Sequence, residues 1–278
     1  MSSSTPPGAP CPNCLSGYIL PGEPSGQMVK AVGSSPEAYL SSKNTKPPEG
    51  GQKKAIVLLT DIFGLPLVNC KILADAFNER VGVDVYVPDL FQGRPPVTLE
   101  QIQPYQKDLP GEKLTWSEKF WFVAKFITFL PGFLPNRPKF ANIRAETFIR
   151  GLKEEKGYSD IGAIGYCYGG HVSTYMAATD LIKTTIVTHP GMINASMIEA
   201  IKVPSLWQIP EEDEQTPDKL RNEIRGILNK KDGIAFEFTE YRGTRHGFAA
   251  RPNLGIPQIK QAYEDALDEG VEWFKKTL

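Results

Sequence analysis

One pattern recurs through most of this sequence: a short, continuously apolar run is followed by a segment whose apolar residues have helical spacing. Runs of this length without polar alternation are typical of strands buried on both faces of a sheet. The clearest run lies at 55–61, and further candidate strands lie at 83–90, 161–166, 184–191, 203–213 and 234–241. The helical segments lie at 66–80, 141–157, 169–180 and 256–278. This alternation predicts an α/β fold with a mostly parallel central sheet and helices on both faces.

The size and charge of the chain restrict its class. A length of 278 residues suits one large α/β domain, and 41% hydrophobic with 23% charged residues predicts a packed core. The net charge of −1 provides no basic field, so we expect neither nucleic acid nor a membrane as a partner. The most apolar stretch, 120–134, contains Lys125 and Pro131 and is too short to span a bilayer.

Residues 1–26 are rich in Ser, Pro and Gly, and we expect an extended or partly ordered tail there. The single domain then covers 27–278, with early strands near 27–33 and 38–42. The first residues lack the basic start and apolar stretch of a secretory signal. Four cysteines, at 11, 14, 70 and 167, do not resemble a disulfide framework. We therefore expect a cytoplasmic protein.

The Cys-Pro-Asn-Cys sequence at 11–14 suggests zinc or redox chemistry. A tetrahedral zinc site needs four ligands, and no second Cys-x-x-Cys is present to complete one. A flexible tail is the favoured interpretation, and we expect no metal and no cofactor.

The sequence Gly-Tyr-Cys-Tyr-Gly-Gly at 165–170 follows a predicted strand and precedes a predicted helix. It has the form of a nucleophile elbow, with Cys167 in place of serine. Glycines two residues from the nucleophile leave room for a strained turn, and the N-terminus of the following helix favours the thiolate. The Tyr168 N–H would form one half of an oxyanion hole. The alternative is a buried cysteine beside glycines that allow close packing.

A thiol nucleophile needs a base, and the chain has three histidines. His171 is one helical turn past the cysteine and is expected to point away from it. His189 follows a strand, where a structural hydrogen bond is the favoured role. His246 lies in a Gly- and Arg-rich loop after the last strand, where α/β-hydrolases place the histidine of their catalytic triad.

Asp213 follows the fifth strand, and its carboxylate could orient His246 and stabilise the imidazolium. The order of nucleophile, acid and histidine is then that of the α/β-hydrolases. Several neighbouring carboxylates could serve in its place: Glu211, Glu212, Glu214 and Asp218.

Five stretches together resemble the dienelactone hydrolase (carboxymethylenebutenolidase) family, especially its eukaryotic and fungal members. They are 61–65, 87–93, 165–170, 210–217 and 246–251. The resemblance implies an α/β-hydrolase fold and a Cys-Asp-His triad made by Cys167, Asp213 and His246. It also implies that a small ester or lactone is the substrate.

The resemblance implies further roles. Asp61 replaces the glutamate of the bacterial family members and would hydrogen-bond the resting thiol. The Ile62 N–H would complete the oxyanion hole. Arg94 and Arg251, each one residue away from the bacterial spacing, would bind a substrate carboxylate. We expect hydrolysis of an activated ester or enol-lactone, because a thiolate needs a substrate with a good leaving group.

The segment 114–135 is dense in aromatic residues, and Trp116, Phe120, Val123 and Ile127 are spaced like one face of a helix. It is expected to be a cap or lid over the site, a helix packed on the sheet, or part of an oligomer contact. A monomer and a homodimer both stay open.

Three functional alternatives also stay open. A glutamine amidotransferase-like protein shares the cysteine motif, but its usual His-x-Glu is absent here, because Gly247 and Phe248 follow His246. A non-catalytic relative could sense oxidants through Cys167. A thioesterase or general esterase could use the same residues.

Overall fold

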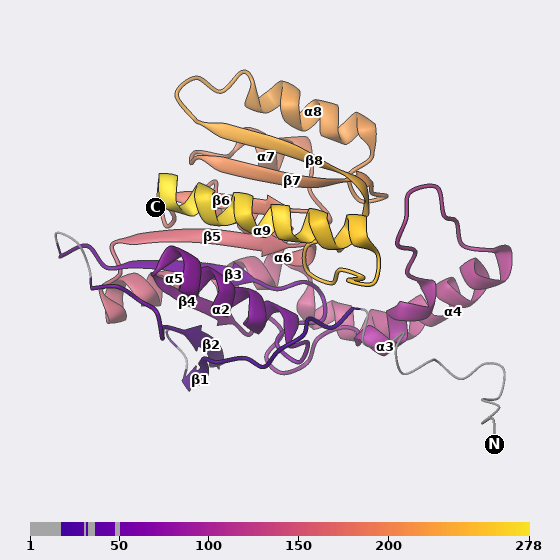
Figure 1. Ribbon diagram of the computed structural model, residues 1–278, viewed down its shortest axis with the longest axis horizontal. Helices are drawn as coiled ribbons and strands as arrows, with labels where there is room; N and C mark the ends of the chain where they lie inside the picture. Colours follow the sequence, from indigo (N-terminus) through magenta and orange to yellow (C-terminus); the bar gives the residue numbers. More distant parts are fainter. Residues whose placement is uncertain (1–17, 31, 33–36, 48–50) are drawn as a thin grey trace.

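The structure is a computed structural model that describes residues 18–30, 32, 37–47 and 51–278. Its described strands form one sheet in the order β1-β2-β4-β3-β5-β6-β7-β8 (Figure 1). They are β1 (Gln27–Lys30), β2 (Glu37–Ser41), β3 (Lys54–Leu59), β4 (Asp84–Pro88), β5 (Asp160–Tyr166), β6 (Thr184–Thr188), β7 (Ser205–Glu212) and β8 (Phe236–Arg245). The pairs β1–β2 and β2–β4 are antiparallel, and all pairs from β4 to β8 are parallel. The predicted α/β fold is confirmed.

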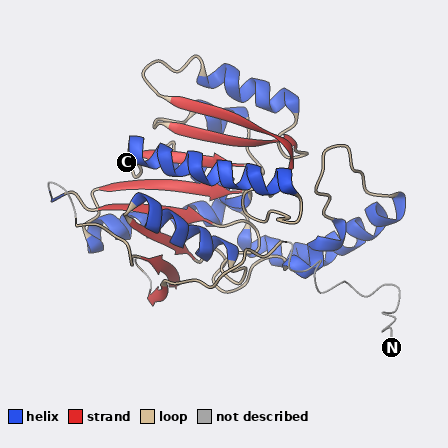
Figure 2. Ribbon diagram, in the orientation of Figure 1, coloured by secondary structure: helices blue, strands red, loops and turns tan. Residues whose placement is uncertain are grey.

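Helices cover both faces of the sheet (Figure 2). The α-helices are α2 (Asn69–Val81), α3 (Leu99–Ile102), α4 (Trp116–Phe133), α5 (Pro138–Lys156), α6 (Tyr168–Met176), α7 (Ala195–Glu199), α8 (Asp218–Leu228) and α9 (Pro257–Thr277), and the 3-10 helices are η2 (Gln103–Tyr105) and η3 (Leu134–Asn136). Helices α2 and α9 pack on one face, where Phe77 and Phe274 meet edge to face. Helices α5, α6, α7 and α8 pack on the other face.

The two early strands, present as β1 and β2, and the six later predicted strands and four predicted helices are all found, and their ends differ by a few residues. Helix α8 was not predicted, because its apolar stripe of Leu220, Ile224 and Leu228 stands in a strongly charged sequence. Within the described residues, no helix is long and apolar enough to cross a membrane.

The predicted N-terminal tail packs on the domain in the part that the structure describes. Tyr18 and Leu20 are buried. The Asn69 side chain accepts a hydrogen bond from the Leu20 N–H and donates one to the Tyr18 carbonyl oxygen. The Cys-Pro-Asn-Cys sequence at 11–14 lies outside the described residues.

Helix α4 extends away from the sheet on the side where the parallel strands end (Figure 1). The predicted face of Trp116, Phe120, Val123 and Ile127 exists, but it is exposed rather than packed on the sheet. Phe129, on the opposite side of the helix, is the buried residue of α4.

Candidate active site

Cys167 lies in the tight turn between β5 and α6. Its backbone has φ 54° and ψ −108°, a conformation rare for residues other than glycine and one that costs about 1–3 kcal/mol. The Cys167 N–H donates to the Thr188 carbonyl oxygen at 3.1 Å. The Cys167 carbonyl oxygen accepts from the N–H groups of Gly170 and Gly191 at 2.9 and 3.0 Å. A strained and well-supported turn therefore lies at the position of the predicted elbow.

The glycines around Cys167 are required by close packing. A Cβ atom on Gly165 would lie 1.9 Å from the Gly169 carbonyl oxygen. A Cβ atom on Gly169 would lie 2.0 Å from the Leu59 carbonyl oxygen. The same contacts bring the start of α6 against β3 and β5 and leave the cysteine at the N-terminus of that helix.

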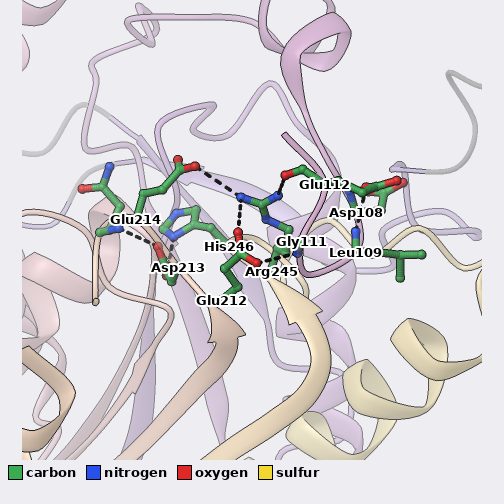
Figure 3. A network of polar contacts seen from close by, with 10 residues as sticks. Asp108, Leu109, Gly111, Glu112, Glu212, Asp213, Glu214, Arg245 and His246 are labelled. Carbon is green, nitrogen blue, oxygen red and sulfur yellow. Dashed lines mark hydrogen bonds and ion pairs between the residues drawn. The ribbon is translucent and has the colours of Figure 1, made fainter. Parts of the chain in front are cut away.

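His246 follows β8, and its imidazole reaches Asp213 at the end of β7. The distance from His246 Nδ1 to Asp213 Oδ2 is 2.8 Å. The Asp213 side chain is buried, whereas a quarter of the His246 side chain is exposed. Asp213 Oδ1 also accepts from the Gln215 N–H at 2.8 Å. The structure thus joins the predicted acid and base, which are 33 residues apart (Figure 3).

The surroundings of these two residues favour their charged forms. Burial lowers the pKa of His246, but the Asp213 carboxylate and the neighbouring Cys167 sulfur outweigh it and hold that pKa well above its usual range. Burial raises the pKa of Asp213, but His246 and the Gln215 N–H outweigh it, so the net pKa is lowered. The site can therefore hold an imidazolium beside the Asp213 carboxylate.

The other carboxylates of this loop have different partners. Glu212 and Glu214 bind the Arg245 guanidinium at 3.1 and 3.2 Å. Glu211 accepts from a backbone N–H, and Asp218 pairs with an arginine of α8. These contacts leave the predicted acid as the one that orients the imidazole.

Asp61 lies two residues after the end of β3 and is fully buried. Its Oδ2 accepts from Arg251 Nε at 2.9 Å, and its Oδ1 accepts from the Phe63 N–H at 3.1 Å. Arg251 Nη1 also donates to Gln106 at 3.1 Å. The sequence predicted that Asp61 binds the thiol and that Arg251 binds a substrate carboxylate. In the structure the two side chains bind each other.

Ile62 and Tyr168 carry the two predicted oxyanion donors. Ile62 lies in the turn that the bond between Asp61 and the Phe63 N–H closes. Tyr168 is the first residue of α6, and its hydroxyl donates to the Asn136 carbonyl oxygen at 2.6 Å. Within the part of the chain that the structure describes, neither backbone N–H has an acceptor.

The side chains of the remaining candidate residues, Arg94, His171 and His189, make no hydrogen bond to Cys167, Asp213 or His246 in the described structure. Arg94 is exposed, and its contacts among the described residues use backbone atoms. His171 Nδ1 contacts the Met192 carbonyl oxygen at 2.8 Å, as expected for a histidine that points away. The buried His189 ring packs edge to face on His246, with 5.0 Å between ring centroids. Neither nitrogen of His189 has a partner in the described structure, so the predicted structural hydrogen bond is absent there.

A loop that the sequence did not indicate, 106–112, lies against the His246 side of the site (Figure 3). Arg245 Nη1 donates to the Glu112 carbonyl oxygen at 2.6 Å, and Gly111 N–H donates to Glu212 at the same distance. The residues 106–108 and Arg251 line a narrow cavity of about 10 Å³ beside His246, room for roughly one water. These contacts join residues more than 100 positions apart, which no local pattern reveals.

Comparison with known proteins identifies the family of this chain. Residues 37–278 match the model of the dienelactone hydrolase family. Hydrolase pyvD of Aspergillus violaceofuscus is 32% identical over 265 residues, which cover 95% of this chain and 96% of the relative. Dienlactone hydrolase 1 of Gibberella moniliformis is 25% identical, with 94% and 91% covered.

Solved structures agree on the fold. The dienelactone hydrolase of Anabaena variabilis superposes with a TM-score of 0.58 and 13% identity, covering 92% of this chain and all of that one. The family match, the relatives and the solved structure each cover nearly the whole chain, and the fold of the solved structure agrees with the family match. The protein therefore belongs to the dienelactone hydrolase family, whose members are hydrolases of ester or lactone bonds.

Proposed function

We propose that the protein is a cysteine-dependent hydrolase of activated esters or enol-lactones, with Cys167, His246 and Asp213 as its catalytic triad. The observation that carries the proposal is the His246–Asp213 hydrogen bond of 2.8 Å beside the strained turn at Cys167. A cysteine that served packing alone would need neither an oriented imidazole nor a strained backbone.

The proposed reaction has two halves. His246 takes the thiol proton, and the Cys167 sulfur attacks the carbonyl carbon of the substrate. The N–H groups of Ile62 and Tyr168 hold the oxyanion, and its collapse breaks the C–O bond. The leaving oxygen takes the proton from His246, and an acyl-thioester stays on the cysteine. Water, deprotonated by His246, then hydrolyses the thioester and restores the thiol.

The substrate class follows from the nucleophile. A thiolate is itself a good leaving group, so the tetrahedral intermediate can expel the cysteine again. It forms the acyl-thioester only when the substrate oxygen is a better leaving group than the thiolate, as an enolate or phenolate is. The ion pair with Asp61 neutralises Arg251, and this leaves little net charge for a substrate carboxylate. The leaving group, rather than a carboxylate, therefore defines the proposed substrate.

The location that fits this chemistry is the cytoplasm. The described cysteines, Cys70 and Cys167, are both free, as a reactive thiol requires.

The proposal is tested with a matched pair of cysteine variants, assayed on p-nitrophenyl acetate and dihydrocoumarin. Burial raises the pKa of the Cys70 thiol well above its ordinary value, so this second cysteine is inert. Cys167→Ala should lower kcat/KM by at least about 10³-fold, and Cys70→Ala should leave it within about threefold. Equal activity of the two variants would exclude the thiol nucleophile. Peroxide oxidation of Cys167 without any hydrolysis would favour the redox-sensing alternative.

A further inference from the structure

Helix α4 presents an apolar face that nothing in the described structure covers. We call it the α4 face: Trp116, Phe120, Val123, Ile127 and Leu130 of α4, with Leu134 at the start of η3. The alternating spacing of four and three residues places these side chains on one side of the helix. Trp116 is 86% exposed, Phe120 67% and Ile127 62%. The apolar surface continues onto the start of α5 through Phe140 and Ile143.

Cations lie near both ends of this face, while Lys125 lies on the other side of the helix, 5.5 Å from the Tyr105 ring. The segment 113–139 contains five exposed cationic residues and a single carboxylate. The cations are Lys113, Lys119, Lys125, Arg137 and Lys139. Within the described residues none of them pairs with a carboxylate, because the Glu118 side chain binds Lys107 at 3.0 Å. The segment around this apolar helix therefore carries an excess of positive charge, although the whole chain has a net charge of −1.

The long cationic side chains lie along aromatic rings. The Lys119 ammonium is 5.3 Å from the Trp116 ring, and the Arg137 guanidinium is 5.4 Å from the Phe140 ring. Such side chains cover apolar surface with their stems and keep the charge at its edge. Aromatic and aliphatic residues ringed by lysine and arginine are characteristic of helices that lie in the plane of a membrane interface.

A second copy of the chain fits this face less well. In a two-fold dimer the same patch meets itself, so the cations at one end of α4 meet those of its partner whichever way the helices run. Negatively charged lipid headgroups complement the cations that border the α4 face, namely Lys113, Lys119, Arg137 and Lys139, while the acyl chains accept the apolar side chains.

We propose that the α4 face docks the protein on an anionic lipid bilayer, with the helix lying in the interface. Phe129, on the other side of α4, packs with Phe63 and Ile62 just after β3, so the helix is anchored beside the carboxyl edge of the sheet. Docking through the α4 face therefore turns the catalytic edge toward the membrane. The net charge of −1, from which no membrane partner is expected, does not show how the charges are distributed along the chain.

The full-length protein can be titrated with vesicles of phosphatidylcholine containing 30% phosphatidylserine, and with vesicles of phosphatidylcholine alone. Trp207 and Trp273 are buried, so a blue shift of tryptophan fluorescence reports on the exposed Trp116 and Trp121. We expect the shift, and co-sedimentation, with the anionic vesicles, and weaker binding as salt rises. Neutral vesicles should bind at least tenfold more weakly.

Two variants and one control locate the surface. Ile127→Glu should weaken vesicle binding at least tenfold, and Lys119→Glu at least about fivefold, the amount expected for one cation near an anionic surface. Lys230→Glu makes the same charge change on an exposed residue away from α4 and should have no effect. All three should unfold at the wild-type temperature and hydrolyse a soluble ester at the wild-type rate, so a failed membrane proposal leaves the proposed function untouched.

Three results would overturn the docking proposal. One is a lack of binding to anionic vesicles at low salt. Another is equal, salt-independent binding to both vesicle types. The third is a dimer in sedimentation equilibrium that Ile127→Glu dissociates, which would assign the face to a second copy.

Discussion

Removing the charge of Arg251 should destabilise the protein through Asp61, and the size of the effect can be worked from the structure. The two side chains form an ion pair at 2.9 Å with 6% and 1% of their surface exposed. Arg251→Met keeps the stem and leaves a buried carboxylate whose remaining donor is the Phe63 N–H. Breaking a buried ion pair on one side costs about 3–5 kcal/mol. A chain of 278 residues has an unfolding entropy of about 0.6 kcal/mol per kelvin, so the melting temperature should fall by about 7 °C.

The partner variant distinguishes a lost charge pair from lost packing. Asp61→Asn alone should also destabilise, since it leaves Arg251 unpaired. The double variant removes both charges and should recover at least about 2 kcal/mol relative to the sum of the single variants. Urea unfolding of the four proteins gives this coupling energy.

The pH dependence gives a second readout. Burial raises the pKa of Asp61, and Arg251 and the Phe63 N–H offset this only in part. Without the arginine the pKa rises further above its unfolded value, so the folded state holds the proton to higher pH. Stability of Arg251→Met should therefore fall as pH rises above about 4. Strict additivity of the two substitutions, or a penalty that does not change between pH 5 and pH 8, would refute the buried pair.

Three further outcomes are expected at the site and one in α8. Asp213→Asn should lower kcat about 10³- to 10⁴-fold with the fold intact, as measured by steady-state kinetics. The reason is that a neutral amide, unlike the Asp213 carboxylate, does not stabilise the imidazolium. The pKa of His246 is raised, so its contribution to stability is present below about pH 6.5 and is lost as pH rises through the folded pKa. His246→Gln should therefore flatten the profile of urea midpoints above pH 6.5. Gly165→Ala should cost about 3 kcal/mol or more in urea unfolding, since its Cβ would lie 1.9 Å from the Gly169 carbonyl oxygen. Gly226→Ala, with open space around it in α8, should instead stabilise by about 0.5–1 kcal/mol.

The sheet could be predicted from the sequence because its central strands are short, largely apolar segments, although β8 alternates apolar and polar residues. The candidate triad could be located because its residues lie where strands end: Cys167 after β5, Asp213 after β7 and His246 after β8. Parallel strands carry such residues to one edge of the sheet, so sequence order was enough to group them.

Contacts between distant segments could not be predicted in the same way. Asp61 and Arg251 are 190 residues apart, and nothing local indicates that the arginine neutralises the acid. The helical spacing in 114–135 correctly predicted that Trp116 and Ile127 lie on one face, but not that this face is exposed. Periodicity shows which residues share a face and not what covers it.

The most direct measurement is the mass of the protein and of its proteolytic peptides. The sample is quenched in acid during turnover of an activated ester whose acyl-enzyme is hydrolysed slowly. The account predicts an acyl adduct on the peptide that contains Cys167, released by neutral hydroxylamine and absent from Cys167→Ala. An adduct on another residue, or hydrolysis by the Cys167→Ala variant at the wild-type rate, would contradict the thiol mechanism.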